Sequence, residues 1–135
     1  MFLLAFPLLI VPLAIYNIMA FIIPVPWDQV VTTVRMISGG EWRITSSDIL
    51  IVVALFFLFF EIIKATRHGT RAIMDHMLST LVFIFALVEF LLIDRAATST
   101  FAILLVICLV DVVAGYSVSI RTAQRDYSIE RSDLA

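Results

Sequence analysis

Three acidic side chains lie inside otherwise apolar stretches of this sequence, at Glu61, Glu89 and Asp111. A charged group at the centre of a bilayer costs at least about 2.5–3.5 kcal/mol, so each carboxylate should face other helices or a wet cavity, pair with a partner, or bind a proton. Two kinds of chemistry fit this pattern: polar contacts that hold helices together, and a pathway for protons or ions.

Asp111 lies farthest from a helix end, because it is about 20 Å along a helix from Thr98 and about 15 Å from Arg121. Gly115, one turn later, would let a neighbouring helix approach the same face closely. The candidate neighbours of Asp111 are Ser79, Thr80 and His76 on the third apolar stretch and Glu61 on the second. A functional role and a structural role both stay open for this residue.

Glu61 and Glu89 lie closer to the expected ends of their helices. Glu61 precedes Lys64 by three residues, a spacing that lets the two side chains pair on one helical face. A carboxylate near the headgroups beside a snorkelling lysine needs no further role. Glu89 is about 7.5 Å along the helix from Asp94. Asn17 in the first apolar stretch should reach the same depth, where its amide can donate a hydrogen bond to Glu89.

Basic and histidine side chains gather in the connection that follows the second apolar stretch. They are Lys64, Arg67, His68, Arg71 and His76. This group can hold an anionic lipid headgroup or phosphate, or it can serve membrane topology alone. Because the two histidines are eight residues apart with Gly69 between them, they do not form the i, i+4 pair that binds zinc from one helix. No metal and no cofactor are expected.

The elements that position these residues are four long apolar segments. Hydrophobic residues make up 62% of the 135 residues and charged residues 15%, and the mean hydropathy is +1.10. A helix needs about 20 apolar residues to cross a bilayer. The sequence therefore predicts an all-α integral membrane protein, a four-transmembrane-helix bundle forming one domain over residues 1–120. The expected crossings are residues 2–25, 48–66, 70–93 and 98–120.

Local signals set the limits of these crossings. Pro7 and Pro12 predict a kink or a late start in the first helix, since proline removes a backbone donor and crowds the preceding turn. Oxygens of the Thr45-Ser46-Ser47-Asp48 run predict the start of the second helix. Gly69 offers a left-handed stop, and Thr70 is the expected cap of the third helix.

The connection after the first crossing contains apolar residues at helical spacing over residues 27–37. It is too short to span a bilayer, so the pattern favours either a helix lying in the membrane interface or an ordered loop. Residues 121–135 are polar and of mixed charge, which predicts a frayed helix end followed by disorder.

Orientation follows from the distribution of lysine and arginine in the short connections. One side of a four-crossing bundle holds six of them: Lys64, Arg67, Arg71, Arg121, Arg125 and Arg131. The other side holds three: Arg35, Arg43 and Arg95. This excess predicts that both termini, including the polar tail, are cytoplasmic.

Several functional classes have no support in the sequence. There is no nucleophile elbow, no glycine-rich phosphate loop and no intramembrane arrangement of histidine and cysteine, so we expect no enzymatic activity. The formal net charge of -2 and the lack of a basic block argue against nucleic acid as a partner. Cys108 is the single cysteine, which excludes an intrachain disulfide.

Two short runs resemble a known family. Phe59-Phe60-Glu61-Ile62-Ile63-Lys64 closes the second crossing and Leu91-Leu92-Ile93-Asp94 closes the third. With this spacing, residues 48–113 resemble the PsiE-type (phosphate-starvation-inducible E) small four-helix bacterial inner-membrane proteins. The resemblance implies a bacterial inner-membrane bundle of unassigned biochemistry, with Glu61, Lys64 and Asp94 as its recurrent polar positions.

Three hypotheses for function follow. The first is a non-enzymatic interaction or accessory protein, which assembles with itself or with a larger membrane complex. The second is an oligomeric transporter or channel subunit for protons, ions or small solutes, in which Glu61, Asp111 and Glu89 form a protonatable path. The third and weakest is a redox-linked anchor, which two histidines near a surface turn do little to support.

Overall fold

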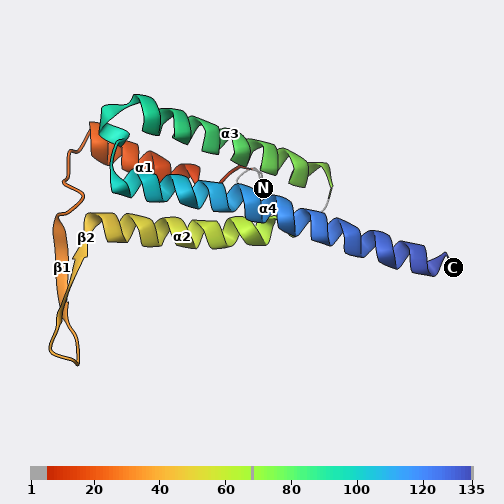
Figure 1. Cartoon of the computed structure of the whole chain (residues 1–135), viewed down its shortest axis with the longest axis horizontal. Helices are drawn as coiled ribbons and strands as arrows, with labels where there is room; N and C mark the ends of the chain where they lie inside the picture. The colour runs from red at the N-terminus through yellow and green to blue at the C-terminus, as the bar shows by residue number, and fades with distance from the viewer. Residues whose placement is uncertain (1–5, 68, 135) are drawn as a thin grey trace.

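The computed structural model describes residues 6–67 and 69–134, and these form four α-helices, a two-stranded hairpin and a short 3₁₀ turn. The elements are α1 (Ile10–Phe21), β1 (Val30–Arg35), β2 (Glu41–Thr45), α2 (Ser46–Lys64), α3 (Thr70–Leu92), η2 (Asp94–Ala96) and α4 (Ser99–Asp133). Successive helices run in opposite directions along one common axis, and the hairpin projects from the end where α1 finishes and α2 begins (Figure 1).

Helices α2, α3 and α4 are each long and apolar enough to cross a membrane. They contain 19, 23 and 35 residues, and a span of the hydrocarbon layer needs about 20. Most of their large apolar side chains are exposed on the outer face of the bundle, where lipid would surround them. The expected class, an integral membrane protein built mainly of helices, is confirmed.

The first apolar segment forms a shorter helix than predicted. α1 has 12 residues and is too short to span a bilayer by itself. The late start that Pro7 and Pro12 predict is confirmed, because the helix begins at Ile10 and Pro12 falls in its first turn. Residues 2–5 of the predicted crossing lie outside the described residues.

The prediction of an interfacial helix in the connection after α1 is wrong. Residues 30–35 and 41–45 pair as an antiparallel hairpin, with Arg35 opposite Glu41 and Val34 opposite Trp42. The run Val30-Val31-Thr32-Thr33-Val34 is entirely β-branched, which lowers helix propensity and favours a strand. The turn needs Gly39, whose φ is +91°. The helical spacing of the apolar residues was outweighed by the types of residue.

One of the two helix caps expected from the sequence is confirmed, and α4 has a cap that was not predicted. Thr45 caps α2 through a reciprocal capping box with Asp48, in which each side chain accepts a backbone N–H of the other residue. Thr98 caps α4 by accepting the N–H of Phe101 at 3.1 Å. The expected cap at Thr70 is wrong, because Gly69, with φ +94°, occupies the cap position and Thr70 is already helical.

The predicted disorder after residue 120 is also wrong for the described part of the tail. α4 continues as one helix to Asp133 and extends well past the ends of α2 and α3 (Figure 1). No glycine or proline follows Gly115. Extending an existing helix requires no new nucleation, so polar composition alone does not end it.

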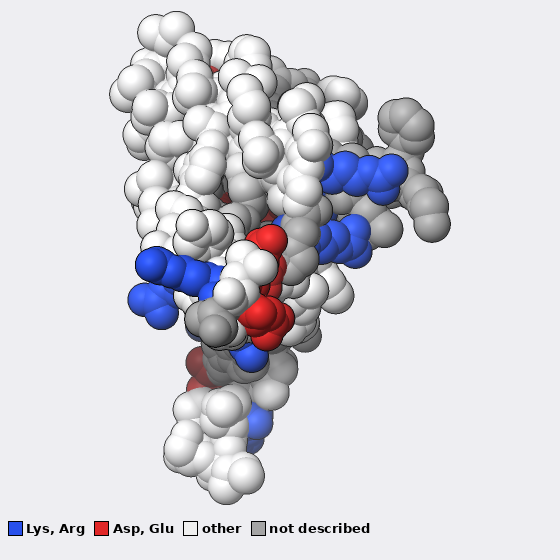
Figure 2. Space-filling view, turned by 90° about the vertical axis from the view of Figure 1, so that its right-hand side faces the viewer, with Lys and Arg blue, Asp and Glu red and all other residues white. Residues whose placement is uncertain are grey.

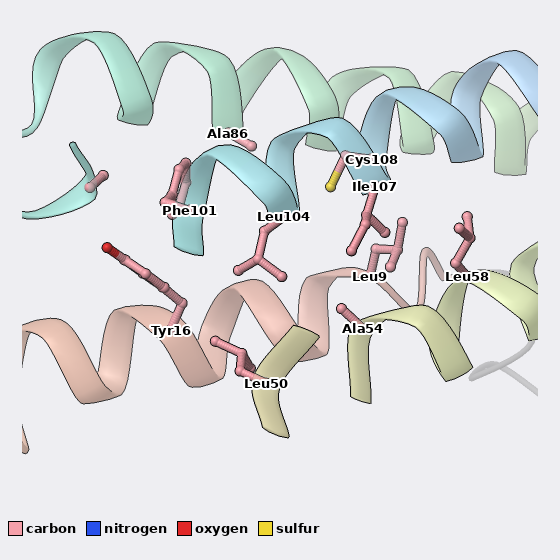
Figure 3. Close-up of a cluster of buried hydrophobic side chains, with 11 residues drawn as sticks. Leu9, Tyr16, Leu50, Ala54, Leu58, Ala86, Phe101, Leu104, Ile107 and Cys108 are labelled. Carbon is pink, nitrogen blue, oxygen red and sulfur yellow. The ribbon is translucent and has the colours of Figure 1, made fainter. Parts of the chain in front are cut away.

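α4 is the central helix, because it packs against α1, α2 and α3. Its inward-facing residues meet those of α1 and α2 in an apolar core (Figure 3). The core residues drawn there are Leu9, Tyr16, Leu50, Ala54, Leu58, Ala86, Phe101, Leu104, Ile107 and Cys108. Small residues such as Ala54 and Ala86 let neighbouring helices approach closely.

Candidate functional site

The most polar part of the interior lies where α2 ends and α3 begins. We call Glu61, Lys64, Asp75, Ser79 and Asp111 the Lys64 cluster. These side chains come from α2, α3 and α4, and all five residues are at least nine-tenths buried. Buried charged groups of this kind require partners, because an isolated charge in an apolar interior is strongly unfavourable.

Lys64 has a full set of partners. Its Nζ lies 3.1 Å from Oε1 of Glu61 and 3.2 Å from Oδ1 of Asp75, and it donates to the backbone carbonyl of Phe6 at 2.9 Å. An ammonium group has three N–H donors, so these three acceptors satisfy it completely. The predicted pairing of Glu61 with Lys64 is confirmed, and the ammonium also joins α2 to α3 and to the segment before α1.

The segment that precedes α1 completes the cluster from a fourth direction. The backbone N–H of Leu8 donates to Oε1 of Glu61. This amide lies just before the first helical residue, where backbone N–H groups have no partner within the helix. Glu61 therefore accepts hydrogen bonds from both Lys64 and the start of α1, and the chain before Ile10 can depart from helical geometry without leaving these groups unsatisfied.

Asp111 reaches the same cluster from α4. The hydroxyl of Ser79 lies within hydrogen-bonding reach of its carboxylate, and Glu61, Asp75 and Lys64 are close enough to interact with it electrostatically. Of the neighbours proposed for Asp111, the structure thus places Ser79 and Glu61 beside it. Among the described residues, two carboxylates pair with the one ammonium here and a third lies nearby, an excess of negative charge that a bound proton would relieve.

His76 belongs to a separate hydrogen-bonded chain next to the Lys64 cluster. Its Nε2 is hydrogen-bonded to the hydroxyl of Ser119, which in turn donates to the carbonyl of Ala65 at 3.0 Å. The ring also lies against Gly115, where an added Cβ would come within 3.0 Å of Nδ1. Gly115 is a close-approach position, as predicted, although the side chain that it admits is His76.

The predicted basic and histidine cluster does not stay together. Lys64 and His76 point into the bundle, whereas Arg67 and Arg71 are exposed. His68 lies outside the described residues. Figure 2, viewed from the end where α4 projects, shows lysine and arginine side chains on the flanks of this end with acidic side chains between them.

Glu89 occupies the opposite half of the bundle. Nδ2 of Asn17 donates to its Oε2 at 3.4 Å and to the carbonyl of Leu13 at 3.0 Å. The predicted interhelical bond between Asn17 and Glu89 is therefore confirmed. The other oxygen, Oε1, is buried without a hydrogen-bond partner in the described part of the chain.

Two polar anchors escaped the sequence reasoning. Asp75 lies near the start of α3, and its position in the sequence did not indicate that it pairs with Lys64. Tyr16 is fully buried, and its hydroxyl donates to the carbonyl of Arg95 at 2.8 Å and lies 2.7 Å from Oγ1 of Thr98. The ring of Tyr16 stacks on Trp27 at 4.5 Å. A tyrosine inside an apolar stretch is a signal for such a contact, since its hydroxyl needs a partner when buried.

Over residues 6–67 and 69–134, no group of three or more histidine, cysteine, aspartate or glutamate side chains is arranged to hold a metal ion. Comparisons with protein-family models, with curated proteins and with solved structures find no match for this chain. The arrangement of its own residues is therefore the basis for any functional proposal.

Proposed function

We propose that this protein is a non-enzymatic subunit of a membrane assembly, formed with further copies of itself or with a larger membrane complex. The observation that carries this proposal is the saturation of Lys64 by Glu61, Asp75 and the Phe6 carbonyl. Polar groups used in this way hold helices in place. They leave no activated nucleophile or open catalytic pair among the described residues of the cluster.

The proposed orientation follows from the distribution of lysine and arginine, and the proposed location follows from the resemblance to PsiE-type proteins. With α1 counted as a fourth membrane-embedded segment, the start of α1 and the end of α4 face the side that holds Arg67 and Arg71. The excess of lysine and arginine on that side favours the cytoplasm, and a bacterial inner membrane is the location that the resemblance implies. The exposed arginines there would contact anionic lipid headgroups.

The test is the composition of the purified protein. We expect native mass spectrometry of the full chain, extracted in a mild detergent, to show a defined oligomer or a stoichiometric partner. A chain that remains monomeric and alone in several mild detergents and in lipid nanodiscs would contradict the assembly role.

A second candidate function is supported by one specific observation. Glu61 and Asp75 pair with the single ammonium of the cluster and the Asp111 carboxylate lies close by, so the Lys64 cluster is suited to bind and release a proton. In this alternative the protein is an oligomeric proton or ion transporter, because four helices enclose little space alone.

Asp111→Asn separates the two functions, since it keeps the shape of the side chain and removes its ability to ionise. If the cluster only joins helices, proteoliposomes should show the same proton and ion flux with the native chain and with Asp111→Asn. Asp94→Asn, outside the cluster, is the matched control. A flux present in the native chain and in Asp94→Asn but absent in Asp111→Asn would favour the transporter.

A further inference from the structure

The last part of α4 extends beyond the bundle without a described element packed against it. Its 35 residues are about 52 Å long at about 1.5 Å per residue, whereas the hydrocarbon layer is about 30 Å thick. About 20 Å of helix therefore projects past the membrane-spanning part (Figure 1). Every described residue from 123 to 134 is exposed.

Half of the residues from 123 to 134 support a helix poorly. Tyr127, Ser128, Ile129, Ser132 and Asp133 all have weaker intrinsic helix propensity than alanine or leucine. The continuity of this projecting helix with the rest of α4 removes the cost of nucleation, and packing against a partner would stabilise it further. A second helix lying along the extension would provide that packing.

One face of α4 has the pattern that such a partner requires. From Val113 to Tyr127, apolar residues recur at alternating spacings of three and four, the a and d positions of a coiled coil, and Leu134 follows one heptad later. We call this set the α4 stripe: Val113, Tyr116, Ile120, Ala123, Tyr127 and Leu134. Its large members are 40% to 84% exposed. Tyr116, the least exposed of them, also lies against the ring of His76 on α3, and its hydroxyl is 3.2 Å from Oγ1 of Thr80. The buried face of α4, which holds Asp111 and Gly115, points the other way.

The charges beside the stripe specify how two copies would pair. Asp126 directly precedes the a residue Tyr127 and so takes a g position, and Arg131 takes the e position that follows. In a parallel pair, a g residue meets the e residue five positions later on the other helix, which brings Asp126 to Arg131 of the second copy. An antiparallel pair would bring like charges together, whereas copies inserted in one direction in a membrane are parallel.

We infer that α4 mediates a parallel homodimer, with a second copy of this chain lying along the α4 stripe and along the projecting part of the helix. This inference rests on the proposed assembly role and names its partner. Glu130 occupies the one d position on the projecting helix that is not apolar, so the two Glu130 carboxylates would face each other and limit the stability of the dimer.

Disulfide cross-linking tests the geometry in the full chain. Ala123→Cys places a thiol on the α4 stripe, and Arg125→Cys places one two residues away on the opposite face, both in a Cys108→Ser background. With the protein dilute in lipid vesicles, we expect mild oxidation to cross-link Ala123→Cys at least fivefold faster than Arg125→Cys. Equal rates would overturn the dimer.

Charge reversal tests the pairing with exposed residues whose replacement leaves the bundle core intact. Asp126→Arg or Arg131→Asp alone should lower the cross-linking rate of Ala123→Cys several-fold, because each places like charges across the interface. The double reversal should restore the rate to within about twofold of the original. Single reversals without effect, or a double reversal without recovery, would contradict the parallel register.

Glu130→Leu should strengthen the dimer, because it replaces the facing carboxylates by an apolar pair. We expect it to raise the cross-linking rate of Ala123→Cys. A decrease would count against the stripe. An oligomer in native mass spectrometry combined with equal rates for Ala123→Cys and Arg125→Cys would show that the α4 dimer is wrong and the assembly role is right. A lone monomer would contradict both.

Discussion

At the scale of single residues, Lys64 is the side chain on which most of the interior depends. It is bonded to α3 and to the segment before α1 as well as to its own helix, and it is only 5% exposed. Removing one partner of a buried ion pair leaves an uncompensated charge, which is much costlier than replacing the whole pair.

We therefore expect Lys64→Met to destabilise the fold by about 3–5 kcal/mol, because Glu61 and Asp75 lose their cation. The unfolding of detergent-solubilised protein can be followed by the fluorescence of Trp27, which stacks on Tyr16. Arg67→Met is the matched control. It removes an exposed charge one turn later and should change the stability by no more than about 0.5 kcal/mol.

Equal stability of Lys64→Met and Arg67→Met would show that the ammonium contributes little and that the Lys64 cluster is held by other contacts. A large loss with both variants would indicate instead that the net charge at this end of the bundle matters more than the buried pairing.

Some of the buried polar contacts could be predicted from the sequence, and others could not. The pairs Glu61 with Lys64 and Asn17 with Glu89 follow from helical spacing and from depth, which are properties of one or two helices. Asp75 could not be assigned to the cluster, because its partner lies across a turn whose path depends on the left-handed Gly69. Spacing within a helix is readable from sequence, whereas contacts across turns are not.

At the scale of elements, the hairpin is the feature that the hydrophobic pattern misassigned. The connection is exposed along β1 and along most of β2, where only Ile44 and Thr45, next to α2, are half-buried. Its stability depends on the turn, where Gly39 adopts φ +91° with open space around its Cα. Any cost of a side chain there comes from backbone strain, since nothing would collide with the new Cβ.

Gly39→Ala should loosen the hairpin by about 1–2 kcal/mol, the cost of a left-handed conformation for a residue with a Cβ. Hydrogen exchange of the β1 and β2 amides in lipid should then become about 5–30 times faster. Gly40→Ala is the control, because Gly40 has no positive φ and an added Cβ would make only ordinary contact with Ser38. Equal exchange in the two variants would exclude strain at the turn.

The helices themselves were predicted closely, within a few residues at each end of α2 and α3. Their limits follow from capping residues and from the loss of apolar character, both local properties. The length of α4 could not be predicted in this way. Polar composition indicates where a helix leaves the membrane, and it does not indicate whether the helix stops there.

At the scale of the whole molecule, three helices that are long and apolar enough to cross a membrane alternate in direction, and α1 packs beside α2 and α4. This arrangement places the hairpin at one end of the bundle and the start of α3 at the other (Figure 1). It also places the projecting end of α4 on the same side as the start of α3. The buried depth of the Lys64 cluster, and the direction in which two copies of α4 would meet, both depend on this arrangement.

Site-specific labelling with a membrane-impermeant maleimide tests this arrangement of the helices across the membrane most directly. Three single cysteines in a Cys108→Ser background, at Ser38 in the hairpin turn, Arg71 at the start of α3 and Ser132 near the end of α4, are all at exposed positions. We expect reagent added to one face of sealed vesicles to label Arg71→Cys and Ser132→Cys together, and Ser38→Cys only from the other face. Labelling of all three from one face would contradict the membrane-spanning bundle.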